Sequence, residues 1–130
     1  MTEQRNNKEI VSKFWMLFNE REFDIAGDLM HENAIVWWPN TREVFKGRDN
    51  FILANKRYPG CWLISIEKIF SIDDTVISIV RVEAEDKTNS FYATSFFTLR
   101  KKLIQQITEY WGINEEPPEW RNKEALSERY

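Results

Sequence analysis

Apolar residues in the first part of the chain recur at the spacing of an amphipathic helix. Five of them fall on one face of the first such pattern: Ile10, Val11, Phe14, Leu17 and Phe18. This spacing predicts a helix over residues 7–20, with Asn6 and Glu9 as its capping pair. A shorter pattern between Phe23 and Met30 predicts a second helix, so the chain opens with a helical pair.

Two short extended segments and a third helix are predicted next. Residues 34–38 are a run of β-forming side chains that Pro39 stops, and residues 43–45 form a second, shorter run. Together these runs predict a small hairpin. The apolar spacing over residues 48–56 predicts a third helix, which ends at the Tyr58-Pro59-Gly60 turn.

The second half of the chain changes to the period of a β-strand. Short polar turns separate four β-rich runs: residues 62–70, 75–86, 90–100 and 103–113. Four consecutive strands predict an antiparallel meander, and only the preceding helices can cover one of its faces. We therefore expect an α+β fold in which the helices lie on one side of the sheet. Beyond the last strand we expect a short helix or a frayed tail.

Composition and charge narrow the class of protein. The chain has 130 residues, of which 42% are apolar and 15% aromatic, and its net charge is −3 with both signs spread along its length. This predicts one domain over residues 1–130, with a core of about 6–113 and a tail of 114–130. It argues against a nucleic-acid partner. A single cysteine, no apolar leader and no apolar run long enough to cross a membrane predict a cytoplasmic protein.

The charged residues inside predicted strands are the first candidates for chemistry, because such residues are seldom buried without a partner. Arg81 and Glu83 are two residues apart and share one face of their strand, and Glu109 sits among apolar residues of the last strand. If these faces form one concave surface, Arg81 would hold two carboxylates, one of them with a pKa suited to proton transfer. The alternative is an outward salt bridge of little energetic consequence.

Aromatic residues are the second unusual feature of the sequence. Three adjacent pairs must each send one ring to either face of a strand: Trp37-Trp38, Phe96-Phe97 and Tyr110-Trp111. The face without helices then needs burial, which predicts a homodimer through the outer face of the sheet. Rings on the concave side either fill the core or line a pocket for a small apolar molecule.

Other residue types point away from metal and nucleotide chemistry. His31 is the only histidine, has no second ligand at metal-binding spacing, and is expected at the end of the second helix on the surface. Cys61 has no histidine near it in sequence, and we interpret it as a small buried residue. The glycines are isolated, so no phosphate-binding loop is predicted. We expect neither a metal nor a cofactor.

The order of these elements resembles the nuclear transport factor 2-like superfamily, and within it the bacterial SnoaL-like proteins. Three segments carry the resemblance: Asn33 to Pro39, Phe45 to Asp49 and Ile107 to Trp111. The resemblance covers about residues 6–113. It implies a cystatin-like cone, in which a curved antiparallel sheet wraps around N-terminal helices and leaves a pocket at the open end. It also implies a dimer through the other face of the sheet.

Ketosteroid isomerases, which share this fold, differ from this chain at their catalytic positions. Their catalytic tyrosine corresponds to Phe14 here, five residues before Asn19, and their aspartate base corresponds to Trp38. Without that base and that hydroxyl donor, steroid isomerisation by the same mechanism is excluded.

Limonene epoxide hydrolases are more similar at the charged positions. Their arginine and two aspartates correspond to Arg81, Glu83 and Glu109, and SnoaL-like cyclases also use an acid at the last position. The tyrosine and asparagine that hold the hydrolases' water correspond to Ile35 and Trp37, so no obvious residue positions a water here.

Three hypotheses follow from the sequence and the resemblance. The first is a protein with a pocket for a small apolar molecule, lined by Trp15, Trp37, Trp38, Phe97 and Trp111. The second is a hydrolase, cyclase or isomerase whose catalytic candidates are Glu109, Arg81 and Glu83. The third is a dimeric interaction module that binds no ligand.

Overall fold

The computed structural model describes residues 2–130, with side chains described from Asn6 onward. Its helices are α1 (Thr2–Asn19), α2 (Phe23–Gly27), α3 (Arg48–Arg57) and α4 (Glu119–Lys123). Its strands are β1 (Met30–Trp38), β2 (Glu43–Lys46), β3 (Trp62–Ile72), β4 (Thr75–Ala84), β5 (Ser90–Arg100) and β6 (Leu103–Ile113). The predicted order of helices and strands is confirmed.

The strands form one six-stranded sheet in the order β2-β1-β6-β5-β4-β3. The predicted meander of β3 to β6 and the β1–β2 hairpin are both antiparallel in the structure. Strand β1 pairs with β6 in parallel, and this long-range pairing joins the two halves of the chain. The sheet is therefore mixed.

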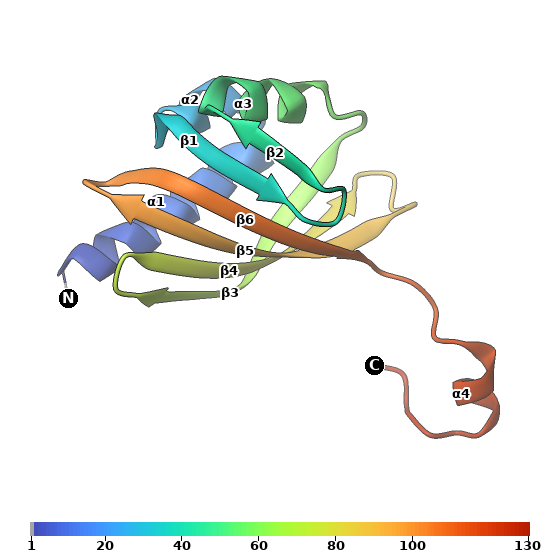
Figure 1. The fold of residues 1–130 in the computed structure, drawn as a ribbon. Helices are drawn as coiled ribbons and strands as arrows, with labels where there is room; N and C mark the ends of the chain where they lie inside the picture. Colours follow the sequence, from blue (N-terminus) through green and yellow to red (C-terminus); the bar gives the residue numbers. More distant parts are fainter. Residues whose placement is uncertain (1) are drawn as a thin grey trace.

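The helices α1 to α3 lie on one side of the sheet, and α1 crosses β3 and β4 (Figure 1). We call the face toward α1 the inner face and the opposite face the outer sheet face. The core lies between α1 and the inner face, where the Phe14 ring centroid is 5.5 Å from that of Phe97 and 4.3 Å from that of Phe18. This arrangement confirms the α+β cone.

Two predicted boundaries are wrong at the start of the chain. Helix α1 begins at Thr2, so Asn6 and Glu9 lie inside the helix and do not cap it. Strand β1 begins at Met30, which places His31 in this strand and not at a helix end. The register with β6 shifts between Met30 and Ile35, and such an irregularity removes the alternation that reveals a strand in a sequence.

The interpretation of Cys61 as a buried residue is also wrong, because its side chain is exposed. Cys61 directly follows Gly60, whose φ of 91° requires a glycine, and precedes the first residue of β3. It therefore lies in the connection before the strand, where neither face of the sheet buries it.

The aromatic pairs divide between the two faces as predicted. Phe97 is fully buried, whereas Phe96 is 40% exposed on the outer sheet face, and its ring contacts Tyr110 with centroids 6.2 Å apart. None of the helices formed by the described residues is long and apolar enough to cross a membrane.

Candidate functional site

The most unusual side chain of the inner face is the carboxyl of Glu109, which is only 7% exposed. Its Oε1 accepts a hydrogen bond from the Trp38 indole N–H at 2.9 Å, and its Oε2 accepts one from the Ser95 hydroxyl at 3.0 Å. Ser95 lies directly opposite Glu109 in the β5–β6 register, so the sheet itself positions this donor. Both donors are uncharged.

Burial determines the proton affinity of this carboxyl. Removal from water disfavours the ionised form and raises the pKa of Glu109, while the two hydrogen bonds from Trp38 and Ser95 lower it by less. An acid in this state keeps its proton to higher pH than an exposed glutamate. A carboxyl with a raised pKa is a candidate for proton transfer.

Aromatic rings surround Trp38, the donor to Glu109. The Trp38 ring meets Phe45 edge-on with centroids 4.6 Å apart and Trp111 edge-on at 5.2 Å. We call Glu109, Ser95, Trp38, Trp111 and Phe45 the Glu109 site. It combines one carboxyl with three aromatic side chains from β1, β2 and β6.

Asn40 fixes the relative position of β1 and β6 beside this site. Its side-chain amide donates to the Trp111 carbonyl at 2.8 Å, and its Oδ1 accepts from the Trp111 N–H at 3.0 Å. This pair of hydrogen bonds imitates a strand partner just after β1 ends at Trp38. The only sequence signal near this contact is the Pro39-Asn40 turn, which does not specify Trp111 as its partner.

A second polar pair extends the row of polar groups across the inner face. The Trp15 indole N–H donates to the Ser78 hydroxyl at 2.9 Å, and Ser78 lies opposite Ser95 in the β4–β5 register. Both serines are fully buried. This pair was not predicted. Its one signal in the sequence is that Ser78 stands between Val76 and Val80 on the apolar face of β4.

The expectation that Arg81 and Glu83 share a concave face with Glu109 is wrong. Arg81 lies opposite Tyr92 in the register, whereas Glu109 lies opposite Ser95. Tyr92 and Ser95 are an odd number of residues apart, so they point to opposite faces of β5. Arg81 and Glu83 therefore form a partly exposed ion pair with each other on the outer sheet face.

The five aromatic residues predicted to line a pocket occupy three different environments. Trp38 and Trp111 belong to the Glu109 site, and Trp15 and Phe97 are buried in the core, with ring centroids 6.1 Å apart. Trp37 was placed wrongly. It follows the alternation of β1 onto the outer sheet face, where it is 45% exposed and cannot line a pocket beside Glu109.

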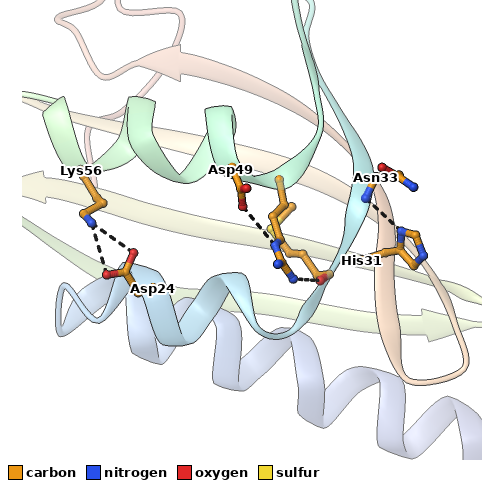
Figure 2. A network of polar contacts seen from close by, with 7 residues as sticks. Asp24, His31, Asn33, Asp49 and Lys56 are labelled. Atoms are coloured by element: carbon orange, nitrogen blue, oxygen red, sulfur yellow. Dashed lines mark hydrogen bonds and ion pairs between the residues drawn. The ribbon is translucent and has the colours of Figure 1, made fainter.

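Two hollows of the surface lie away from Glu109. One, of about 320 Å³, is formed by α2 and α3 and includes Asp24, Asp49 and Lys56. Figure 2 shows these side chains, with Lys56 Nζ 3.1 Å from Asp24 Oδ1, and the nearby Asn33 N–H donating to His31 Nδ1 at 3.0 Å. The other hollow, of about 560 Å³, includes Cys61 and Trp62.

The possible metal ligands of the described residues lie apart from one another. Within the part of the chain that the structure describes, histidine, cysteine and carboxylate side chains form no group of three that could hold a metal ion. The Nδ1 atom of His31 accepts the hydrogen bond from its near neighbour Asn33.

Comparison with known proteins identifies the fold. No family model and no curated protein matches this sequence. A candidate ketosteroid isomerase from Kribbella flavida matches with a TM-score of 0.84 and 23% identity, over 98% of this chain and 91% of its own. An NTF2-like protein of unknown function from Burkholderia xenovorans matches with a TM-score of 0.83 and 20% identity, over 95% of each chain.

A weaker structural similarity extends to an epoxide hydrolase. An LEH-like epoxide hydrolase from Mycobacterium tuberculosis matches with a TM-score of 0.73 and 13% identity, over 85% of both chains. At these identities the similarity concerns the fold, which proteins of several activities share. The helices on the inner face, the six-stranded sheet and these matches together show that the chain has the nuclear transport factor 2-like fold.

Proposed function

We propose that this protein binds a small apolar molecule at the Glu109 site and that Glu109 transfers a proton to or from it. The observation that carries the proposal is the buried Glu109 carboxyl, held by the uncharged donors of Trp38 and Ser95. Buried acids with shifted proton affinity are enriched at functional sites. Because Arg81 and Glu83 occupy the outer sheet face, the proposal rests on Glu109 without them.

Proton relocation within one molecule is the reaction class that this site supports best. An ionised Glu109 takes a proton from one carbon of the ligand and returns it to another, so the step needs no water and no co-reactant. The rings of Trp38, Phe45 and Trp111 favour a flat, apolar ligand. Hydrolysis by addition of water is less favoured. In the resemblance to limonene epoxide hydrolases, Ile35 and Trp37 stand where those enzymes have the tyrosine and asparagine that hold the water.

The test uses 3-cyclohexen-1-one, which isomerises to the conjugated 2-cyclohexen-1-one when a proton moves from carbon 2 to carbon 4. We expect the wild-type protein to accelerate this conversion and Glu109→Gln to slow it by about 10²–10⁴-fold. Glu83→Gln removes a strand carboxyl from the other face and is the matched control, with a rate within about twofold of wild type. The conversion is followed by ultraviolet absorbance.

The wild-type rate should also increase with pH as the Glu109 carboxyl ionises, a readout that requires no variant. Circular dichroism checks the fold of both variants. Equal rates for the wild type and Glu109→Gln would overturn the proposal. A wild-type protein that neither accelerates the reaction nor changes its tryptophan fluorescence with the enone would overturn it as well.

We further propose that the protein forms a homodimer through the outer sheet face. Exposed or half-buried apolar side chains from five strands support this surface: Trp37, Phe70, Ile77, Tyr92, Phe96 and Tyr110. A contiguous apolar area on a sheet without covering helices is typical of an interface.

We also propose the cytoplasm as the compartment, because an exposed thiol without a second cysteine suits reducing conditions.

A dimeric interaction module without a ligand is the second candidate function. The packing of the inner face favours it, since Phe14, Phe51 and Phe97 are fully buried side chains that fill the space between α1, α3 and the sheet. This candidate predicts the same dimer but no fluorescence change with the enone and no rate above that of buffer.

A further inference from the structure

The segment that follows β6 leaves the rest of the fold. We call residues 114–130 the C-terminal arm. Its first residue is tied to β5, because the Asn114 N–H donates to the Ser90 carbonyl at 3.0 Å and the Asn114 side chain donates to the Ser90 hydroxyl at 2.9 Å. Beyond this point the arm extends away from the sheet, and α4 lies apart from the other elements (Figure 1).

The contacts that the structure records for the remainder of the arm join residues of the arm to each other. Arg129 pairs with Glu116, and the Arg121 guanidinium lies 5.6 Å from the Trp120 ring centroid. Trp120 is 57% exposed and Leu126 is 64% exposed. A helix as short as α4 is marginal in water by itself, so contact with a further surface would stabilise it.

The comparisons indicate that an arm at this place belongs to the fold of some solved proteins. The Kribbella and Burkholderia structures match 98% and 95% of this chain, so their matches continue beyond Ile113 into the arm. The match with the M. tuberculosis epoxide hydrolase covers 85% of this chain. An arm in this position is therefore shared with the Kribbella and Burkholderia structures.

We propose that the C-terminal arm of one protomer docks on the outer sheet face of a second copy of this chain. The inference rests on the proposed homodimer and assigns the arm a role in it. The arm offers Trp120 and Leu126, and the outer sheet face offers a row of register neighbours from β3, β4 and β5, namely Phe70, Ile77 and Phe96. Each copy supplies one arm and one face, so a two-fold dimer makes this contact twice and closes.

The geometry favours a second copy over the arm's own domain. Strand β6 carries Tyr110 on the outer sheet face, and the arm continues from the end of this strand away from its own sheet. The arm therefore projects toward the second copy, and the homodimer would bury each outer sheet face under the arm of its partner. Apolar arm residues and an apolar face then form one continuous interface.

The first test measures dimer dissociation by sedimentation equilibrium of the full chain. Trp120→Ala should raise the dissociation constant by about tenfold or more, as expected for a buried interface tryptophan. Leu126→Ala should raise it less. Ile25→Ala removes an exposed apolar side chain from α2, on the helical side of the fold, and should leave the constant within about twofold of wild type.

The second test locates the arm in the dimer. A nitroxide spin label is placed at position 127 by Ser127→Cys in a Cys61→Ser background, and this protein is mixed with ¹⁵N-labelled protein that carries no spin label. Broadening of outer-face amides in the ¹⁵N-labelled copy, including those of Phe70 and Phe96, is the expected result. Broadening elsewhere in that copy, or none in a dimeric sample, would overturn the inference.

The two proposals fail in different ways. A protein that sediments as a dimer but shows no broadening between copies, with Trp120→Ala at the wild-type dissociation constant, contradicts the arm contact and leaves the homodimer standing. A protein that sediments as a monomer at every concentration contradicts both.

Discussion

At the scale of single residues, Glu109 is a carboxyl that the local sequence does not mark as buried, although only 7% of it is exposed. From the sequence alone, a carboxyl at this position of a strand fits the protein surface equally well. Its burial and its two hydrogen-bond donors, Trp38 and Ser95, define its chemistry. The folded protein binds the Glu109 proton more tightly than the unfolded chain does, because burial raises the pKa of this carboxyl.

The first prediction concerns the pH dependence of stability. A raised pKa in the folded state means that the stabilising contribution of Glu109 is complete below the unfolded value, about 4.3, and is lost as pH increases through the folded value. Glu109→Gln should therefore lose less stability than wild type as pH increases from about 4 to 8, by about 1.4 kcal/mol for each unit by which the pKa is raised. Urea unfolding across this range measures the difference, and parallel curves would contradict the prediction.

The second prediction compares two adjacent tryptophans of β1. Trp38→Phe removes the indole donor to Glu109 and leaves a buried carboxyl oxygen without this partner, so we expect a loss of about 1–3 kcal/mol in the free energy of unfolding. Trp37→Phe makes the same chemical change on the outer sheet face and, at protein concentrations below the dimer dissociation constant, should alter the stability of the monomer by less than about 0.5 kcal/mol. Urea unfolding at one protein concentration measures both, and equal losses would show that the Glu109 contact is not responsible.

At the scale of elements, the pairing of β1 with β6 assembles the Glu109 site. Trp38 comes from β1 and Glu109 from β6, and Asn40 joins the end of β1 to β6 through both backbone groups of Trp111. The helix over 48–56, the hairpin and the meander were predictable from local periodicity. The parallel β1–β6 contact was not, because nothing local in either segment specifies a partner so far away in the chain.

The third prediction concerns this junction. Asn40→Ala removes two hydrogen bonds to Trp111 and should cost about 1–2 kcal/mol, at the lower end because the contact is exposed. Amide hydrogen exchange of Trp38 and Trp111 should accelerate. Asn114→Ala removes a side-chain hydrogen bond to Ser90 on the other side of β6 and is the matched control. If the Trp38 and Trp111 amides exchange as fast in Asn114→Ala as in Asn40→Ala, then Asn40 does not hold β1 in place.

At the scale of the whole molecule, the fold separates an inner face packed against α1 from an outer sheet face that is rich in exposed apolar side chains and that none of the described helices covers. The aromatic pairs predicted this separation, since each pair must divide between the faces. The outer sheet face also contains the Arg81–Glu83 ion pair, which is the outward salt bridge that the sequence left open as the alternative to a pocket.

The fourth prediction tests the proposed homodimer. Phe96→Glu introduces a charge on the central part of the outer sheet face and should raise the dimer dissociation constant at least about 100-fold, which corresponds to about 2.7 kcal/mol. Leu53→Glu places the same charge on the exposed side of α3 and should leave the dimer intact. Sedimentation equilibrium measures both constants. Retention of the wild-type dimer by Phe96→Glu would exclude this face as the interface.

The sequence by itself determined the helices, the strands and the division of each strand into two faces, because these depend on the periods of nearby residues. It did not determine which faces of different strands coincide. The β4–β5 and β5–β6 registers place Ser78, Ser95 and Glu109 on one face and Arg81 with Tyr92 on the other. A shift of one residue in register inverts every side chain of a strand, so this choice depends on long-range pairing that only the tertiary structure decides.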